Sequence, residues 1–130
     1  MNTTVYLLLR WAIAASMIGH GLVRLPKLNG FSGWMVQSFE KSMLPQALVL
    51  PFSYVLPIAE FIIGILLLIG LGTRIALIGG GILMAFLVLG STLIESWDFI
   101  TGQLVHAAFF AVLLQFISSN TFAVDNLLKK

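Results

Sequence analysis

Cysteine is absent from this sequence of 130 residues. Its absence excludes disulfide bonds, thiol redox chemistry and iron–sulfur or zinc sites ligated by cysteine within the chain. The sequence also has no phosphate-binding loop, no Ser–His–Asp set and no carboxylate-rich metal motif, so we expect no metal site. It has no dinucleotide-binding motif either. Electrons for any redox reaction would therefore come from a partner protein.

Charged residues are scarce and make up only 9% of the chain, whereas soluble domains contain about 25%. Hydrophobic residues make up 59%, and the mean hydropathy is +1.05. This balance predicts an integral membrane protein whose first partner is the lipid bilayer. The seven Lys and Arg residues are scattered, and no basic run with interleaved aromatics occurs. Nucleic-acid binding is therefore not expected.

The long apolar stretches are four: Thr4–Val23, Leu48–Ile69, Thr73–Ile94 and Leu104–Ile117. Crossing a bilayer takes about 20 residues of helix, so the first three suffice, and the fourth should be tilted or begin nearer Phe99. The N-terminal stretch is longer than the apolar core of a usual signal peptide, so we expect a span there. The predicted fold is all-α, an integral membrane bundle of four transmembrane helices with both termini on one side.

The distribution of basic residues gives a weak orientation signal. Arg74, Lys129 and Lys130 fall on the side of the termini, with Arg10 close to it, whereas Arg24, Lys27 and Lys41 fall on the other side. The counts nearly balance, and the positive-inside rule then slightly favours cytoplasmic termini.

The first connection has a pattern of its own. Between Phe31 and Met43, large apolar residues recur at helical spacing with polar residues between them. This pattern predicts a short amphipathic helix in the membrane interface, between the first and second spans. The alternative is an ordinary solvated loop. Two runs of small residues, Ala15-x-x-x-Gly19 and Gly79-Gly80-Gly81, are expected to permit close helix packing.

Glu60 stands near the middle of the second span, where an ionised carboxylate is costly. Depth counted at about 1.5 Å per residue places Arg10 close enough to reach it. An Arg10–Glu60 ion pair could merely lock two helices together, or it could line a site in which Glu60 exchanges a proton. Pro57 leaves the carbonyl of Ser53 without its helical partner, one turn from Glu60, so Ser53 is a further candidate for ligand binding.

Two histidines form a second candidate group. His20 ends the first span and His106 begins the fourth, so both should lie at similar depth near the same membrane face. Facing imidazoles can relay protons or contact a quinone, and the nearby Arg24 favours that interpretation. Haem ligation is less favoured, because only one His pair exists and haem also needs a broad apolar slot. The alternative is two interfacial histidines bonded to their neighbours.

The order of these motifs resembles the DoxX-like family of small four-helix membrane proteins. The first span reads LLLRWAIAASMIGHGLVRL, the second reads PIAEFIIGILLLIGLGTR, and the chain closes on NTFAVDNLL. The resemblance covers nearly the whole chain and implies a single transmembrane domain over residues 1–130. It also implies a bacterial cytoplasmic (inner) membrane as the location.

Some members of this family are membrane subunits of quinone-reducing oxidoreductases, so the resemblance implies a quinone as cofactor and a protein partner in or at the membrane. The expected site is Glu60 and His20 as proton-exchanging residues, with Arg10, Arg24, His106 and Ser53 as binding residues. Whether the chain is itself an enzyme stays open. The main alternative is a non-catalytic scaffold or accessory subunit of a larger membrane complex. A small transporter is a further alternative, weakened by the lack of paired broken helices.

Overall fold

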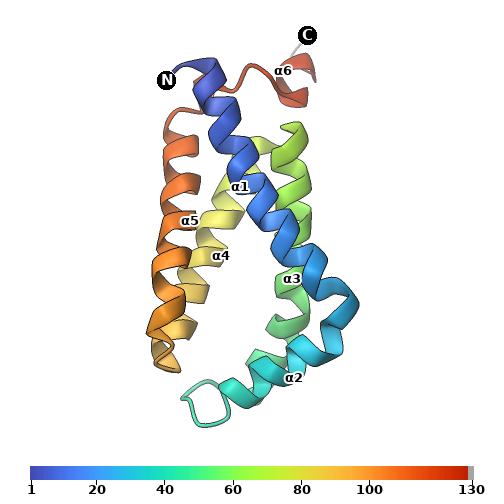
Figure 1. Cartoon of the computed structure of the whole chain (residues 1–130), viewed down its shortest axis with the longest axis vertical. Helices are drawn as coiled ribbons and strands as arrows, with labels where there is room; N and C mark the ends of the chain where they lie inside the picture. The colour runs from blue at the N-terminus through green and yellow to red at the C-terminus, as the bar shows by residue number, and fades with distance from the viewer. Residues whose placement is uncertain (129–130) are drawn as a thin grey trace.

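The computed structural model describes residues 1–128 and is almost entirely helical over that range (Figure 1). The chain forms, in order, α1 (Thr3–Arg24), the 3₁₀ turn η1 (Leu25–Lys27), α2 (Leu28–Ser38), α3 (Gln46–Ile69), α4 (Thr73–Leu93), α5 (Trp97–Gln115), the 3₁₀ turn η2 (Ile117–Ser119) and α6 (Val124–Leu128). Residues 1–128 contain no β-strand. The all-α prediction is therefore confirmed.

Four helical segments are long and apolar enough to cross a membrane: Thr3–Ser38, Gln46–Ile69, Thr73–Leu93 and Trp97–Gln115. The fourth begins at Trp97, so the expectation that it starts before Leu104 is confirmed. Both described ends of the chain lie at the same end of the bundle (Figure 1). The membrane side that this end faces stays a prediction, and Lys129 and Lys130, which were counted for it, lie outside the described residues.

The helix predicted in the first connection exists, but its limits differ from the predicted Phe31–Met43. Helix α2 begins at Leu28, directly after the Pro-initiated turn η1, and ends at Ser38. Beyond it the chain turns, with Ser42 Oγ donating to the carbonyl of Phe39, and Pro45 then disfavours helical backbone at the preceding residue. Whether α2 lies in the membrane interface stays a prediction.

Helices α1 and α3 approach each other closely at two glycines. A Cβ atom on Gly21 would lie 2.7 Å from the Cβ of Phe61, and one on Gly64 would lie 2.6 Å from Cγ1 of Ile18. Within residues 1–128 nothing lies within 4 Å of a Cβ on Gly19, so the close packing predicted at that residue is not found inside the bundle. Small residues let transmembrane backbones come near each other, and here Gly21 and Gly64 do so.

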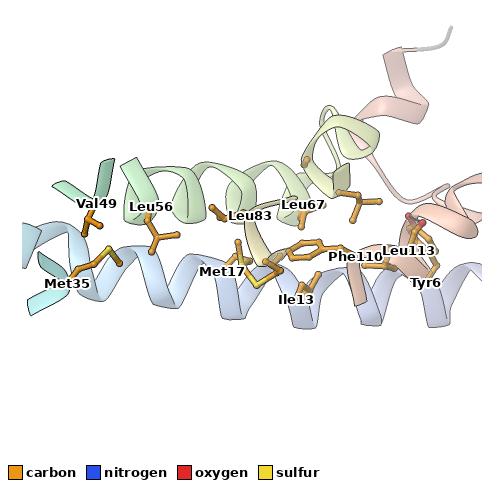
Figure 2. Packing of buried hydrophobic residues seen from close by; sticks show 14 residues of the cluster. Tyr6, Ile13, Met17, Met35, Val49, Leu56, Leu67, Leu83, Phe110 and Leu113 are labelled. Carbon is orange, nitrogen blue, oxygen red and sulfur yellow. Dashed lines mark hydrogen bonds between the residues drawn. The ribbon is translucent and has the colours of Figure 1, made fainter. Parts of the chain in front are cut away.

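Helices α4 and α5 form the second close pair. Gly80 lies under the ring of Phe110, where a Cβ would come within 2.6 Å of two ring carbons. The prediction for the triple-glycine run is therefore confirmed at this residue. Buried side chains from both pairs, Met17, Leu67 and Phe110 among them, meet in one core (Figure 2).

We expect Gly64→Ala to destabilise the protein by about 1–3 kcal/mol, because the added methyl group meets the backbone of α1 rather than a flexible side-chain end. Gly19→Ala is the matched control on the same helix pair. With open space around it, the change should be neutral or stabilise the helix by up to about 1 kcal/mol. Thermal unfolding in detergent micelles measures both. Equal midpoints for the two variants would contradict the close approach at Gly64.

Candidate functional site

A cavity of about 680 Å³ lies between the two helix pairs, toward the end of the bundle that α2 crosses. The pairs are joined at the other end by the short α3–α4 turn and diverge toward α2 (Figure 1). Each of the helices α1 to α5 contributes side chains to the cavity lining. Most of these side chains are apolar or aromatic, including Phe31, Trp34, Phe52, Leu56 and Leu87. Polar side chains also line it, among them His20, Arg24, Glu60 and His106.

Glu60 is paired with Arg24, not with Arg10 as predicted. Nη1 of Arg24 donates to Oε1 of Glu60 at 2.8 Å. The two ends of the pair differ in burial, since the side chain of Arg24 is 31% exposed and that of Glu60 only 3%. Arg24 also lies over the ring of Phe31, with its guanidinium carbon 4.6 Å from the ring centroid. One side chain thus links α1, α2 and α3 beside the cavity.

Arg10 lies at the opposite end of the bundle, away from the cavity. It is 2% exposed, and its Nη1 donates to Oδ1 of Asn120 at 2.6 Å. The reason is the offset between the antiparallel helices. Gly21 of α1 lies beside Phe61 of α3, so Arg10 lies near Gly70, whose Cβ would be 3.1 Å from Nη1 of Arg10. At about 1.5 Å per residue, that level is about 15 Å from Glu60 along α3.

The structure brings the two histidines together, as their positions predicted. Their ring centroids are 5.8 Å apart and the rings are nearly perpendicular. His106 bonds through Nε2 to Ser16 Oγ at 2.6 Å, and His20 bonds through Nδ1 to the carbonyl of Ser16 at 2.7 Å. Both imidazoles line the cavity together with Glu60 and Arg24. His20, Arg24, Glu60 and His106 therefore form one group, which we call the polar cluster.

Ser53 is not among the residues that line the cavity. Its hydroxyl is fully buried between α2 and α3, where it is 2.6 Å from the hydroxyl of Ser32 and donates to the carbonyl of Leu50. In this structure the Ser53 side chain holds α2 against α3, and its predicted part in ligand binding has no support from its position.

Sequence reasoning missed a polar pair on the α4–α5 side of the cavity. Ser91 Oγ donates to Oε1 of Gln103 at 3.1 Å, and both residues line the cavity. Ser91 lies near the end of α4 and Gln103 lies in the second turn of α5. The sequence gives no signal that these two side chains meet.

The donor set of the polar cluster suits hydrogen bonding and proton transfer more than metal binding. No group of three or more His, Asp or Glu side chains in residues 1–128 could hold a metal ion. The cluster instead offers a guanidinium, a carboxylate and two imidazoles at the wall of an apolar cavity. Such an arrangement can bind an apolar molecule that carries polar oxygens and can exchange protons with it.

The chain was compared with protein families, curated proteins and solved structures. The model of the family described as DoxX matches residues 5–96, which is more than half of the chain. The matched range includes three members of the polar cluster and ends before His106. None of the curated proteins and none of the solved structures matches the chain. On the family match, this four-span membrane protein belongs to the DoxX family.

Proposed function

We propose that the protein is a membrane subunit of an oxidoreductase system and binds a quinone in the cavity. The observation that supports this most is the combination of an apolar cavity within a membrane bundle and a polar cluster at its wall. Its volume of about 680 Å³ falls in the range of about 300–1,000 Å³ that is usual for small-molecule sites. Membership of the DoxX family agrees with a membrane protein of this kind.

The chemistry of quinone reduction fits the residues of the polar cluster. A quinone takes up two electrons and two protons to become a quinol, so each carbonyl oxygen gains a proton. A site for this reaction needs an apolar surface for the ring, a cation near the oxygen that becomes negative, and a group that delivers protons. The aromatic side chains supply the apolar surface, and Arg24 supplies the cation. Glu60 and the histidines are the groups that can deliver protons. The electrons come from a partner redox protein.

Haem fits the cluster less well than a quinone. A haem iron held by both imidazoles needs one free ring nitrogen from each. Nε2 of His106 is bonded to Ser16 and its Nδ1 to the carbonyl of Gly102, both within 2.7 Å. Ligation by His106 would therefore require one of these bonds to break.

A pair of tryptophan substitutions tests the proposal. Leu87→Trp places a large ring in the cavity, and we expect it to weaken quinone binding at least about tenfold. Ile82→Trp is the matched control, because Ile82 lies on the same helix, is 53% exposed and does not line the cavity. Equilibrium titration of the purified protein in lipid nanodiscs with a membrane quinone measures both affinities.

The outcomes separate the proposal from its main alternative. Equal binding by the two tryptophan variants would remove the cavity as the site. Absence of quinone binding by the unchanged protein, together with stable co-purification of other subunits, would favour a non-catalytic scaffold. In that case the polar cluster would serve only to fix the helices relative to one another.

A further inference from the structure

Ser16 lies on α1 between the two histidines and bonds to both of them. Its hydroxyl is 2.6 Å from Nε2 of His106, and its backbone carbonyl is 2.7 Å from Nδ1 of His20. His106 makes a matching bond inside α5, where its Nδ1 lies 2.7 Å from the carbonyl of Gly102. Each imidazole is thus held through Nδ1 by a carbonyl one helical turn earlier.

These partners determine which nitrogen of each ring carries the proton. A carbonyl oxygen can only accept a hydrogen bond, so Nδ1 of both His20 and His106 must be the donor. A neutral imidazole then has an unprotonated Nε2, which can only accept. The hydroxyl of Ser16 therefore donates to Nε2 of His106 and occupies its lone pair. Nε2 of His20 has no hydrogen-bond partner within residues 1–128.

We infer that Ser16 is a positioning residue that makes the two histidines unequal, leaving Nε2 of His20 as the imidazole nitrogen that meets the ligand. His20 lines the cavity together with Glu60 and Arg24, so its free nitrogen has access to a molecule bound there. His106, whose two ring nitrogens are both engaged, holds α5 against α1 through Ser16. This inference rests on the proposed function only for the identity of the ligand.

The proton step that follows is simple. Protonated His20 carries N–H bonds on both ring nitrogens. Its Nε2–H bond breaks, the electron pair stays on Nε2, and the proton forms an O–H bond on a quinone oxygen that has already received electrons from the partner redox protein. His20 returns to the neutral form with Nδ1–H, which is the form that the Ser16 carbonyl holds. The ring does not have to turn during the step.

Nitrogen NMR of protein labelled with ¹⁵N-histidine tests the assignment without any quinone. We expect both histidines in the Nδ1–H form when neutral. Ser16→Ala should move the Nε2 resonance of His106 toward that of a nitrogen without a hydrogen bond. It should change His20 little, because Nδ1 of His20 keeps its 2.7 Å bond to the backbone carbonyl, and the hydroxyl of Ser16 is 3.5 Å from it. Ser16→Thr keeps a hydroxyl and should restore the signal of His106. A neutral His20 with Nε2–H, or a His106 signal that Ser16→Ala does not change, would overturn the inference.

Quinone-dependent activity in native membranes tests the consequence. His20→Gln should lower the rate about a hundredfold, because glutamine can hydrogen-bond at this position but cannot transfer a proton. His106→Gln should lower it less, and the loss in Ser16→Ala should be recovered in Ser16→Thr. A larger loss of activity in His106→Gln than in His20→Gln would overturn the inference about His20. It would not contradict the proposal that the cavity binds a quinone. If the unchanged protein binds no quinone, the proposed function fails, while the NMR result still decides the role of Ser16.

Discussion

Arg24→Met is expected to destabilise the protein more than Glu60→Gln, although the two side chains form a single ion pair. Without Arg24, the carboxylate of Glu60 remains in the interior at 3% exposure with no cation beside it. Removal of one partner of a buried pair typically costs about 3–5 kcal/mol. In Glu60→Gln, Arg24 loses its anionic partner. Because the side chain of Arg24 is already 31% exposed in the unchanged protein, it can extend toward water, and it keeps its contact with Phe31. That loss should stay near 1 kcal/mol.

Chemical unfolding of the purified variants in micelles measures this asymmetry. The double variant Arg24→Met with Glu60→Gln should recover most of the loss seen in Arg24→Met alone, because no unpaired charge remains. Arg74→Met is the control for removing a cation, since Arg74 is exposed and forms no ion pair within residues 1–128. A Glu60→Gln variant less stable than Arg24→Met would contradict the interpretation that the burial of the Glu60 carboxylate determines the stability lost when the pair is broken.

Glu60→Gln alone separates fold from function, because it keeps Arg24 and should stay folded. If Glu60 serves only to neutralise Arg24, this variant in its native complex should keep its activity and its quinone binding. If Glu60 exchanges protons with a bound quinone, the variant should be folded but inactive. A folded Glu60→Gln variant with unchanged activity would remove Glu60 from the proposed mechanism and leave a structural ion pair.

The number and order of the spans could be predicted from the positions and lengths of the apolar stretches, because a bilayer demands about 20 apolar residues and a helical backbone at each crossing. The closeness of His20 and His106 followed from the same topology, since the first span ends and the fourth begins on one side. Both predictions depend only on which residues lie at which membrane face. Neither prediction depends on the axial offset between neighbouring helices.

The partner of Glu60 could not be predicted, because it depends on the axial offset between α1 and α3. Depths counted from the ends of the spans assume that the helices start level with one another. In the structure the close contacts of Gly21 and Gly64 set the offset between α1 and α3. They place Arg24 beside Glu60 and carry Arg10 out of reach. The glycines were visible in the sequence, but their partners across the interface were not.

The opposite end of the bundle holds a second buried cation, whose partners come from the C-terminal segment. Arg10 is 2% exposed and donates to Oδ1 of Asn120, while the amide nitrogen of Asn120 donates to Thr73 Oγ1 at 3.1 Å. Asp125 accepts from the backbone N–H groups of Gly72 and Thr73 at the start of α4. This segment thus packs polar groups onto the end of the helix bundle, far from the cavity.

Asn120→Leu should therefore destabilise the protein by about 3 kcal/mol or more. The substitution removes the side-chain acceptor of a charged guanidinium that cannot reach water, and its Nε already lacks a partner within residues 1–128. The carbonyl of Leu68, a second acceptor for the guanidinium, is 3.5 Å away and too distant to compensate. Gln115→Leu is the matched control, because it removes the same type of amide from an exposed position. Thermal unfolding in micelles compares the two.

Arg10→Met combined with Asn120→Leu identifies the cause of that loss. If the cost comes from an unpaired buried cation, the double variant should be more stable than Asn120→Leu alone, since methionine leaves no charge to satisfy. If it comes from the lost bond to Thr73 or from poor packing of leucine, the second substitution should bring no recovery. Quinone binding should remain unchanged in the double variant, because Arg10 and Asn120 do not line the cavity. A loss of binding there would show that this end of the bundle and the cavity are energetically coupled.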